Sequence, residues 1–220
     1  MKKNGKKQES YYPVFLKISG KKCLVIGGGR IALRKAASIL DCGAKVTIVG
    51  PVILPELRKL ARKKNLTLIQ RNVQSEDMKT AEIVIAATDS RETNRKVAER
   101  AKKQKVLVNV VDDPDHSDFI VPSFFRRGDL TVAVSTGGSS PAFAKKVRAR
   151  LERMIGEDYS QLLSIVKEVR SELIKKGKKV SPEDWQEGLD LDLFFKLLES
   201  GERKKVRKIL LEELRKAKDS

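Results

Sequence analysis

Short apolar runs alternate with amphipathic stretches along the first half of the chain. The runs are four or five residues long and rich in β-branched side chains, which is typical of buried parallel strands. We expect five strands, at 23–26, 45–49, 66–69, 83–87 and 106–110. Helices are expected between them, at 32–40, 55–64 and 92–103. This alternation predicts βαβ units around one parallel sheet.

The pattern changes after Val111. Two further strands are expected at 119–121 and 130–134, and the segment between them, which contains Arg126-Arg127-Gly128-Asp129, is typical of a turn and not of a crossover helix. A loop rich in glycine and serine follows at 135–141. The change predicts a small segment that does not continue the parallel sheet.

From Ala142 to Ser220 the pattern is helical almost throughout, with interruptions near 175–181 and at 200–201. Ser181 is followed by a proline and two acids, which is the pattern of a capped helix N-terminus. The last third of the chain is therefore expected to be a small helical domain.

A glycine-rich loop, Gly27-Gly28-Gly29-Arg30-Ile31-Ala32, stands directly after the first expected strand and opens the first expected helix. Gly27, Gly29 and Ala32 fit the pattern G-x-G-x-x-A of dinucleotide-binding Rossmann domains. Glycine lets the backbone approach a pyrophosphate closely, and the helix N-terminus presents N–H groups to the phosphate charge. The loop predicts dinucleotide binding, and the alternative is a tight turn without a ligand.

The acid that usually holds the ribose hydroxyls is missing at the end of the second strand, where Val49-Gly50-Pro51-Val52 stands instead. No arginine stands there for a 2′-phosphate either, so residue type does not decide between NAD and NADP. Arg30 could reach a phosphate, and a solvated first-turn arginine is the other interpretation.

The expected fold is α/β. A Rossmann-type NAD-binding domain at 11–112 is followed by a small α+β segment at 113–141 and a C-terminal helical domain at 142–220, while residues 1–10 form a basic tail.

An acidic stretch, Asp112 to Asp118, follows the fifth expected strand and contains four aspartates without any lysine or arginine. It lies where the carboxyl ends of parallel strands face a cofactor. Asp112, nearest the strand, is the best candidate for a general base or a ligand of a divalent cation. Turn chemistry is the alternative, because aspartates before proline are common for their hydrogen bonds alone. His116, the only histidine, could supplement carboxylates at a metal or be a solvated loop residue.

The loop from Ser135 to Pro141 leads into a strongly basic helix. Its hydroxyls and N–H groups at a helix N-terminus could bind a carboxylate, or simply cap the helix.

The chain carries 47 Lys and Arg against 29 Asp and Glu, a net charge of +18. Such a charge attracts polyanions, which could be nucleic acid or an acidic small molecule, or it could belong to a solvated surface. Aromatic residues are few, at 5%, which disfavours nucleic acid.

The chain has no apolar run of membrane-spanning length and no secretory signal, so a cytoplasmic location is expected. Cys23 and Cys42 lack metal-ligand spacing and are expected to be buried.

Five segments together resemble the siroheme synthase amino-terminal module, precorrin-2 dehydrogenase. They match in order and are Gly27–Lys35, Ala86–Asp89, Asn109–Asp112, Phe119–Ser123 and Val134–Pro141. The resemblance covers about residues 11 to 155, whereas the helical tail is similar only in general character.

The resemblance implies NAD-dependent oxidation of precorrin-2 to sirohydrochlorin in siroheme biosynthesis. Some members also insert Fe²⁺, which leaves ferrochelatase activity open. Asp112 matches the family's essential aspartate and is our candidate for the catalytic proton acceptor. The implied NAD contacts are Gly27, Gly28, Gly29, Arg30, Ile31, Pro51, Val52 and Thr88, and the implied substrate contacts are Ser135, Thr136 and Gly137. No metal ligands are expected.

Thr136 stands where some relatives carry a serine that can be phosphorylated, but we do not extend this modification to Thr136. The resemblance places segment 113–141 at a homodimer contact. A polycarboxylate such as precorrin-2 also accounts for the positive charge. Two alternatives stay open, namely an NAD-sensing regulatory module without turnover and a nucleic-acid-binding protein built on the basic tail helices.

Overall fold

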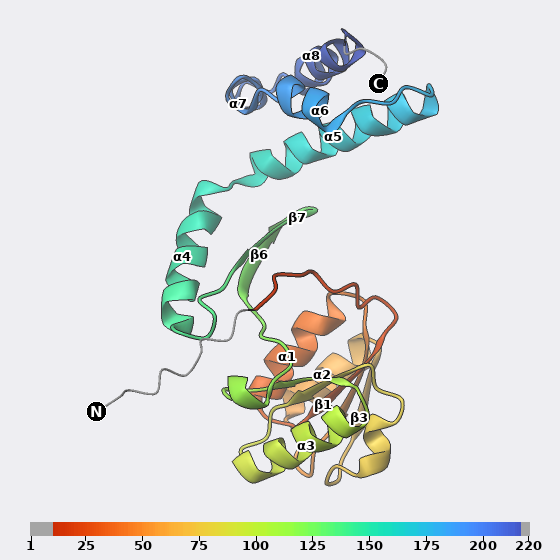
Figure 1. Ribbon diagram of the computed structural model, residues 1–220, viewed down its shortest axis with the longest axis vertical. Coiled ribbons are helices and arrows are strands. Elements are labelled where there is room, and N and C mark those ends of the chain that lie inside the picture. Colours follow the sequence, from red (N-terminus) through yellow and green to blue (C-terminus); the bar gives the residue numbers. More distant parts are fainter. Residues whose placement is uncertain (1–10, 217–220) are drawn as a thin grey trace, which may run out of the picture. The chain divides into compact units, whose positions relative to one another are not determined.

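A computed structural model describes residues 11–216 (Figure 1). The chain divides into two compact units, one ending at Val121 and the other beginning at Pro122. The basic tail predicted at 1–10 lies outside the described residues.

The first unit contains a five-stranded parallel sheet with the strand order β3-β2-β1-β4-β5. The strands are β1 (Lys22–Ile26), β2 (Lys45–Val49), β3 (Leu66–Ile69), β4 (Ile83–Ala86) and β5 (Leu107–Val110). All four pairings are parallel, with Ile26 opposite both Val49 and Ala86 at the carboxyl end of β1. This is the Rossmann-type sheet that the alternating pattern predicts.

Helices pack on this sheet through two apolar clusters. The helices of the first unit are α1 (Arg30–Leu40), α2 (Pro55–Lys63) and α3 (Arg91–Lys103), with 3₁₀ turns η1 (Ser75–Met78) and η2 (Pro114–His116). Ala32, Ala36 and Leu57 of α1 and α2 are buried in one cluster, and α3 contributes Val97 and Ala101 to the other. Alternate strand residues enter the two clusters because side chains of a strand point to opposite faces.

The second unit begins with an antiparallel hairpin, β6 (Ser123–Arg127) and β7 (Leu130–Val134). Gly128, with φ 54°, supplies the left-handed backbone that its two-residue turn needs. The strand predicted at 119–121 is wrong, since β6 starts at Ser123. Pro122 has no N–H to give to a ladder, so regular pairing starts after it.

Five helices complete the second unit. They are α4 (Pro141–Met154), α5 (Glu157–Lys175), α6 (Pro182–Gly188), α7 (Leu191–Glu199) and α8 (Arg203–Lys216). The last four share an apolar core, in which Ile165 of α5, Phe194 of α7 and Leu210 of α8 are almost completely buried. Ser181 caps α6 in a capping box with Asp184, as its sequence predicts.

Along the chain, the first unit ends at Val121, nine residues after the end expected at 112. Residues 113–121 belong to the first unit because they are hydrogen-bonded to β5. No helix within 11–216 is long and apolar enough to span a bilayer.

The two cysteines differ in burial. Cys23 is buried as expected, and burial raises the pKa of its thiol to about 11, whereas Cys42 is only partly buried. The difference follows from position, since Cys23 lies in a central strand and Cys42 in the turn after α1.

Candidate active site

The glycine loop after β1 lies against two neighbouring loops. Gly27 adopts φ 117°, and a Cβ there would lie 2.3 Å from the carbonyl oxygen of Ala87. A Cβ on Gly28 would lie 1.9 Å from the carbonyl oxygen of Val52. Glycine is therefore required at both positions for the loops after β1, β2 and β4 to approach one another.

Gly29 differs from these two glycines because a Cβ there would meet nothing within 4 Å. It is the N-cap of α1 and has no side-chain cap. The first turn of α1 contains no acidic residue, so its N–H groups and the helix dipole face no negative charge from that turn. The open backbone and the uncapped helix start form a cradle that suits a phosphate.

The loop after β2 presents apolar residues where a ribose would lie in this fold. Pro51 is exposed and Val52 is 75% exposed. The Gln70 amide donates to the Pro51 carbonyl oxygen at 3.3 Å, and Arg58 of α2 donates to Gln70 at 2.6 Å. The loop is thus held by its neighbours and carries no carboxylate of its own.

The loop after β4 is built around Thr88 and Asn94. The Thr88 hydroxyl donates to the Asn94 side-chain oxygen at 2.7 Å, and the Asn94 amide donates to the Thr88 carbonyl oxygen at 3.0 Å. Asn94 is only 6% exposed, and Ser90 caps α3 by accepting from the N–H of Thr93. The sequence does not single out Asn94, because an asparagine four residues after a serine cap is ordinary until the fold shows its hydrogen bonds to Thr88.

Asp112 stands just beyond β5 with φ 58°, in the left-handed region. Apart from Lys105, it is the only non-glycine residue with positive φ among the described residues. Its side chain is exposed and, among the residues that the structure describes, makes no hydrogen bond or ion pair. The N–H of Val111, directly before it, donates to Ala86 at the end of β4. Asp112 therefore lies beside the loop that carries Thr88, at the edge where the fold binds ligands.

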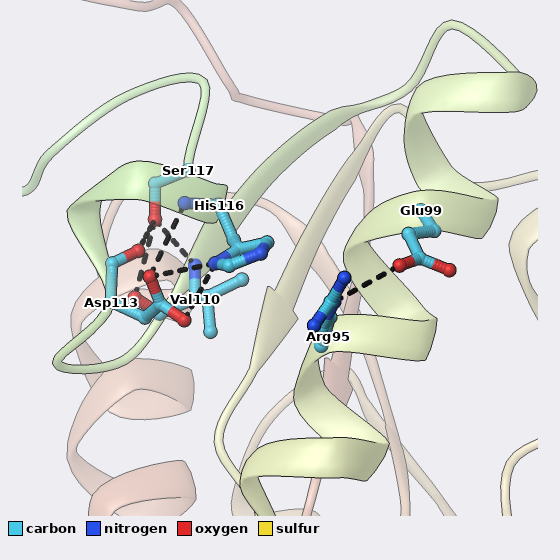
Figure 2. A network of polar contacts seen from close by, with 6 residues as sticks. All are labelled: Arg95, Glu99, Val110, Asp113, His116 and Ser117. Carbon is cyan, nitrogen blue, oxygen red and sulfur yellow. Dashed lines mark hydrogen bonds and ion pairs between the residues drawn. The ribbon is translucent and has the colours of Figure 1, made fainter.

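The residues after Asp112 use their side chains to hold the turn, as Figure 2 shows. The Asp113 carboxylate caps η2, accepting from the N–H of His116, and lies 2.8 Å from the imidazole Nδ1 of His116. The hydrogen bond with His116 lowers the pKa of Asp113. Ser117 accepts from the N–H of Val110 at 2.9 Å and donates to the Asp113 carbonyl oxygen at 2.8 Å.

The free edge of β5 is covered in the same way. Asp118 accepts from the N–H of Val108 at 2.9 Å, and the Asn109 amide donates to the Phe119 carbonyl oxygen at 2.9 Å. The side-chain oxygen of Asn109 is buried and has no hydrogen-bond partner in the part of the chain that the structure describes. Hydrogen bonds within the turn thus account for Asp113 and Asp118, whereas the Asp112 carboxylate is available to a ligand.

The pair of Asp113 and His116 is not joined by a third ligand. Within residues 11–216 no group of three or more His, Cys, Asp and Glu is placed to hold a metal ion. Arg95, also drawn in Figure 2, is paired with Glu99 of its own helix α3 at 3.2 Å.

Lys35 lies near Asp112 and was not a candidate from the sequence. It is partly buried on α1, and burial lowers the pKa of its ammonium, as does the charge of Arg34, while the charge of Asp112 acts in the opposite direction. The one sequence feature that could point to Lys35 is its spacing. It stands four residues after Ile31, an implied NAD contact, and therefore lies on the same flank of the helix.

The loop with Ser135, Thr136 and Gly137 belongs to the second unit. Ser135 accepts from the N–H of Gly137 at 3.1 Å, and Thr136 accepts from the N–H of Ser140 at 3.0 Å. Ser140 itself caps α4. Both side-chain hydroxyls thus shape the loop as acceptors, and their O–H groups donate no hydrogen bond to any described residue.

Two family models match the chain. The first, described as NAD(P)-binding, covers residues 14–123, and the second, described as sirohaem biosynthesis protein central, covers residues 127–154. The first therefore spans the glycine cradle, the Thr88 loop and Asp112, and the second begins at the last residue of β6 and spans the hairpin turn, β7 and α4.

Similar proteins carry related names. The chain is 42% identical over 163 residues to the siroheme synthase of Nitrosococcus oceani, covering 74% of this chain and 35% of that protein. It is 35% identical over 199 residues to the siroheme synthase of Psychromonas ingrahamii, covering 89% of this chain and 42% of that protein. The chain thus spans well under half of the length of these curated relatives.

A solved structure is similar over almost the whole chain. The structure titled SirC, precorrin-2 dehydrogenase, superposes with a TM-score of 0.69 at 28% identity, covering 94% of this chain and 100% of that one. With an NAD(P)-binding model over half of its residues and a sirohaem biosynthesis model directly after it, this chain belongs to the siroheme synthase amino-terminal module family, which includes precorrin-2 dehydrogenase.

Proposed function

We propose that this protein is a precorrin-2 dehydrogenase that oxidises precorrin-2 to sirohydrochlorin with NAD in siroheme biosynthesis. The observation that carries the proposal is the likeness to SirC, precorrin-2 dehydrogenase, because it extends over 94% of this chain and all of that one. The curated siroheme synthases support the same pathway.

The cradle at the glycine loop fits the pyrophosphate of a dinucleotide. Gly27 and Gly28 close the loop against its neighbours, and Gly29 leaves the backbone open above the start of α1. Arg30, Ile31, Pro51, Val52 and Thr88 complete the proposed contacts. When bound, the dinucleotide supplies a hydride acceptor.

NAD is preferred to NADP in this proposal, although the cradle itself fits either. Val52 offers no charged group to a ribose, and its 75% exposed side chain suits an apolar contact with the nucleoside. Arg58 of α2, a cation that could pair with a 2′-phosphate, already donates a hydrogen bond to Gln70.

Asp112 is proposed to accept the proton that leaves the tetrapyrrole when the hydride is removed. Its carboxylate has no partner within residues 11–216, its backbone is in the left-handed region just after β5, and its loop is held by Asp113 and Ser117. Backbone strain of this kind is concentrated at functional sites. The substrate's own carboxylates are proposed to be bound by Ser135, Thr136 and Gly137, whose loop offers hydroxyl donors at the start of basic helix α4.

The test is an anaerobic assay of the full chain with enzymatically made precorrin-2 and NAD. We expect NADH absorbance to rise together with sirohydrochlorin, and the same assay with NADP to give a lower kcat/KM. Binding of NADH without any turnover would identify the NAD-sensing module that the sequence leaves open. A parallel reaction with Fe²⁺ as substrate measures siroheme formation and so decides whether the protein is also a ferrochelatase.

The homodimer is also part of the proposal. The sheet of β6 and β7 has helices α4 and α5 packed against it and contains only two strands among the described residues, so its outer strand edges have no neighbouring strand there. A second copy of segment 113–141 would extend or cover it.

A further inference from the structure

Lys35 is a charged residue to which the proposed function assigns no role. It lies on α1 between Ala32 and Ala36, the two alanines that pack on the sheet. Its side chain is partly buried and forms no hydrogen bond or ion pair with any residue in the described range 11–216. A partly desolvated ammonium without a counter-ion is unfavourable, so the position calls for an anion.

The flank of α1 that carries Lys35 faces the turn after β5. Val111 packs on the apolar cluster that contains Ala32 and Ala36, which brings the next residue, Asp112, to this flank. Figures 1 and 2 both show η2 beside α1, in green and red-orange. Asp112 is close enough for its charge to act on Lys35, but the two form no ion pair.

The direction of the side chain places the ammonium near the ligand edge. Side chains of an α-helix tilt toward its N-terminus, which for α1 is the glycine cradle. The Lys35 ammonium therefore reaches back toward the carboxyl ends of the strands, where this fold binds its ligands. Burial lowers the pKa of Lys35, and an incoming carboxylate would offset that unfavourable desolvation.

We propose that Lys35 binds a carboxylate of the tetrapyrrole substrate and thereby orients the ring beside Asp112. The inference rests on the proposed function, because that function supplies a polycarboxylate ligand. The inference deepens that function by assigning a substrate-binding residue to the unit that carries the glycine loop.

The test compares Lys35→Met with Arg34→Met in the full chain. Lys35→Met keeps the apolar stem and removes the charge, whereas Arg34→Met removes an exposed charge from the neighbouring position of the same helix. We expect Lys35→Met to raise the KM for precorrin-2 by about tenfold to hundredfold, the equivalent of one charge-assisted hydrogen bond, with a much smaller change in kcat. Lys35→Arg should recover most of the affinity, and Arg34→Met should behave like the wild type.

Binding of sirohydrochlorin, followed by its fluorescence, gives a readout that does not need turnover. Its Kd should rise in Lys35→Met in step with the KM, while the Kd for NADH stays unchanged. Sirohydrochlorin should also protect Lys35 from acylation by an amine-selective reagent, measured by mass spectrometry.

An unchanged Kd and KM in Lys35→Met would overturn the inference, as would an equal loss of NADH and sirohydrochlorin affinity, which indicates a structural role. A wild-type chain that binds sirohydrochlorin without oxidising precorrin-2 would refute the proposed function and still let the Kd decide about Lys35. A wild-type chain that binds no tetrapyrrole would refute both.

Discussion

The glycines after β1 show how single residues define the candidate site. Gly28 is enclosed by the Val52 carbonyl oxygen, and Gly29 faces open space. The same residue type therefore serves packing at one position and access for a ligand at the next. The pattern G-x-G-x-x-A predicts the loop but does not distinguish these two roles, because they depend on which loops come close in the fold.

Substitution by alanine should separate the two roles. Gly28→Ala is expected to destabilise the protein by about 1–3 kcal/mol, because its Cβ would meet rigid backbone. Gly29→Ala should change stability by no more than about 1 kcal/mol. It should nevertheless weaken NADH binding on the order of tenfold, the loss of one phosphate hydrogen bond. Urea unfolding and NADH fluorescence measure the two effects, and wild-type NADH affinity in Gly29→Ala would contradict the role of the open backbone.

Asp112→Asn tests the proton acceptor. Asparagine has the size of aspartate and tolerates the left-handed backbone found at this position, so the loop should keep its fold. We expect kcat for NADH formation to fall by about 10²–10⁴-fold, the usual range for one proton-transfer group, while NADH binding is unchanged. Asp115→Asn, an exposed aspartate in the same turn, is the matched control. NADH production from precorrin-2 at the wild-type rate in Asp112→Asn would exclude this role.

The connection after β3 contains an ion pair in which only the carboxylate is buried. Arg71 donates to both carboxylate oxygens of Asp77, at 2.6 and 2.8 Å, and Asp77 also accepts from the N–H of Gln74 in the capping box of η1. The Asp77 side chain is only 7% exposed. These contacts hold the connection that leads into β4, whose end carries the Thr88 loop.

The stability of this connection should depend on pH. The hydrogen bond from Arg71 holds the pKa of Asp77 below its ordinary value of 3.8. The contribution of Asp77 to the free energy of unfolding is therefore complete above that value, and it is lost as the pH falls through the lower pKa of the folded state. Asp77→Asn should lower the free energy of unfolding by about 1 kcal/mol at neutral pH, and by less in strong acid. Urea midpoints of both proteins at the two pH values measure the difference, and a constant difference would contradict the pairing.

Most elements are predictable from the sequence because the strands and helices of the first unit have clear periods. The five parallel strands agree with their predicted positions to within one residue at each end. Segment 119–121 is apolar like a strand, yet its backbone is used by Asn109 at Phe119, and regular pairing begins only after Pro122. The breaks at Gly156 and Asp190 were not predicted, because the apolar pattern continues across them and only tertiary packing decides where those helices end.

The candidate site is less predictable than the fold. Asp112 and the glycine loop stand out because their residue types are unusual for their positions. Lys35 and Asn94 do not, since a lysine and an asparagine on an amphipathic helix are ordinary until the fold shows what surrounds them. The four aspartates of the acidic stretch are alike in sequence, and only the hydrogen bonds of Asp113 and Asp118 separate them from Asp112.

At the scale of the whole molecule, the hairpin of β6 and β7 predicts that two copies of the chain form a dimer. Light scattering at micromolar concentration should give twice the mass of one chain. The net charge of +18 repels copies of the chain at long range, so moderate salt should favour the dimer. A monomer mass at both low and moderate salt would contradict a dimer built on segment 113–141.

The same charge should govern how the substrate is captured. Helix α4 alone carries five basic residues against one acid, and it follows the loop proposed to bind substrate carboxylates. Attraction between a cationic protein and a polycarboxylate is screened by salt, so kcat/KM for precorrin-2 should fall steeply with ionic strength while kcat at saturation changes little. NADH, with fewer charges, should lose less affinity over the same range, which makes its Kd the internal control. If kcat/KM does not respond to salt, the charge serves another partner, and salt-dependent binding to duplex DNA would then identify nucleic acid as that partner.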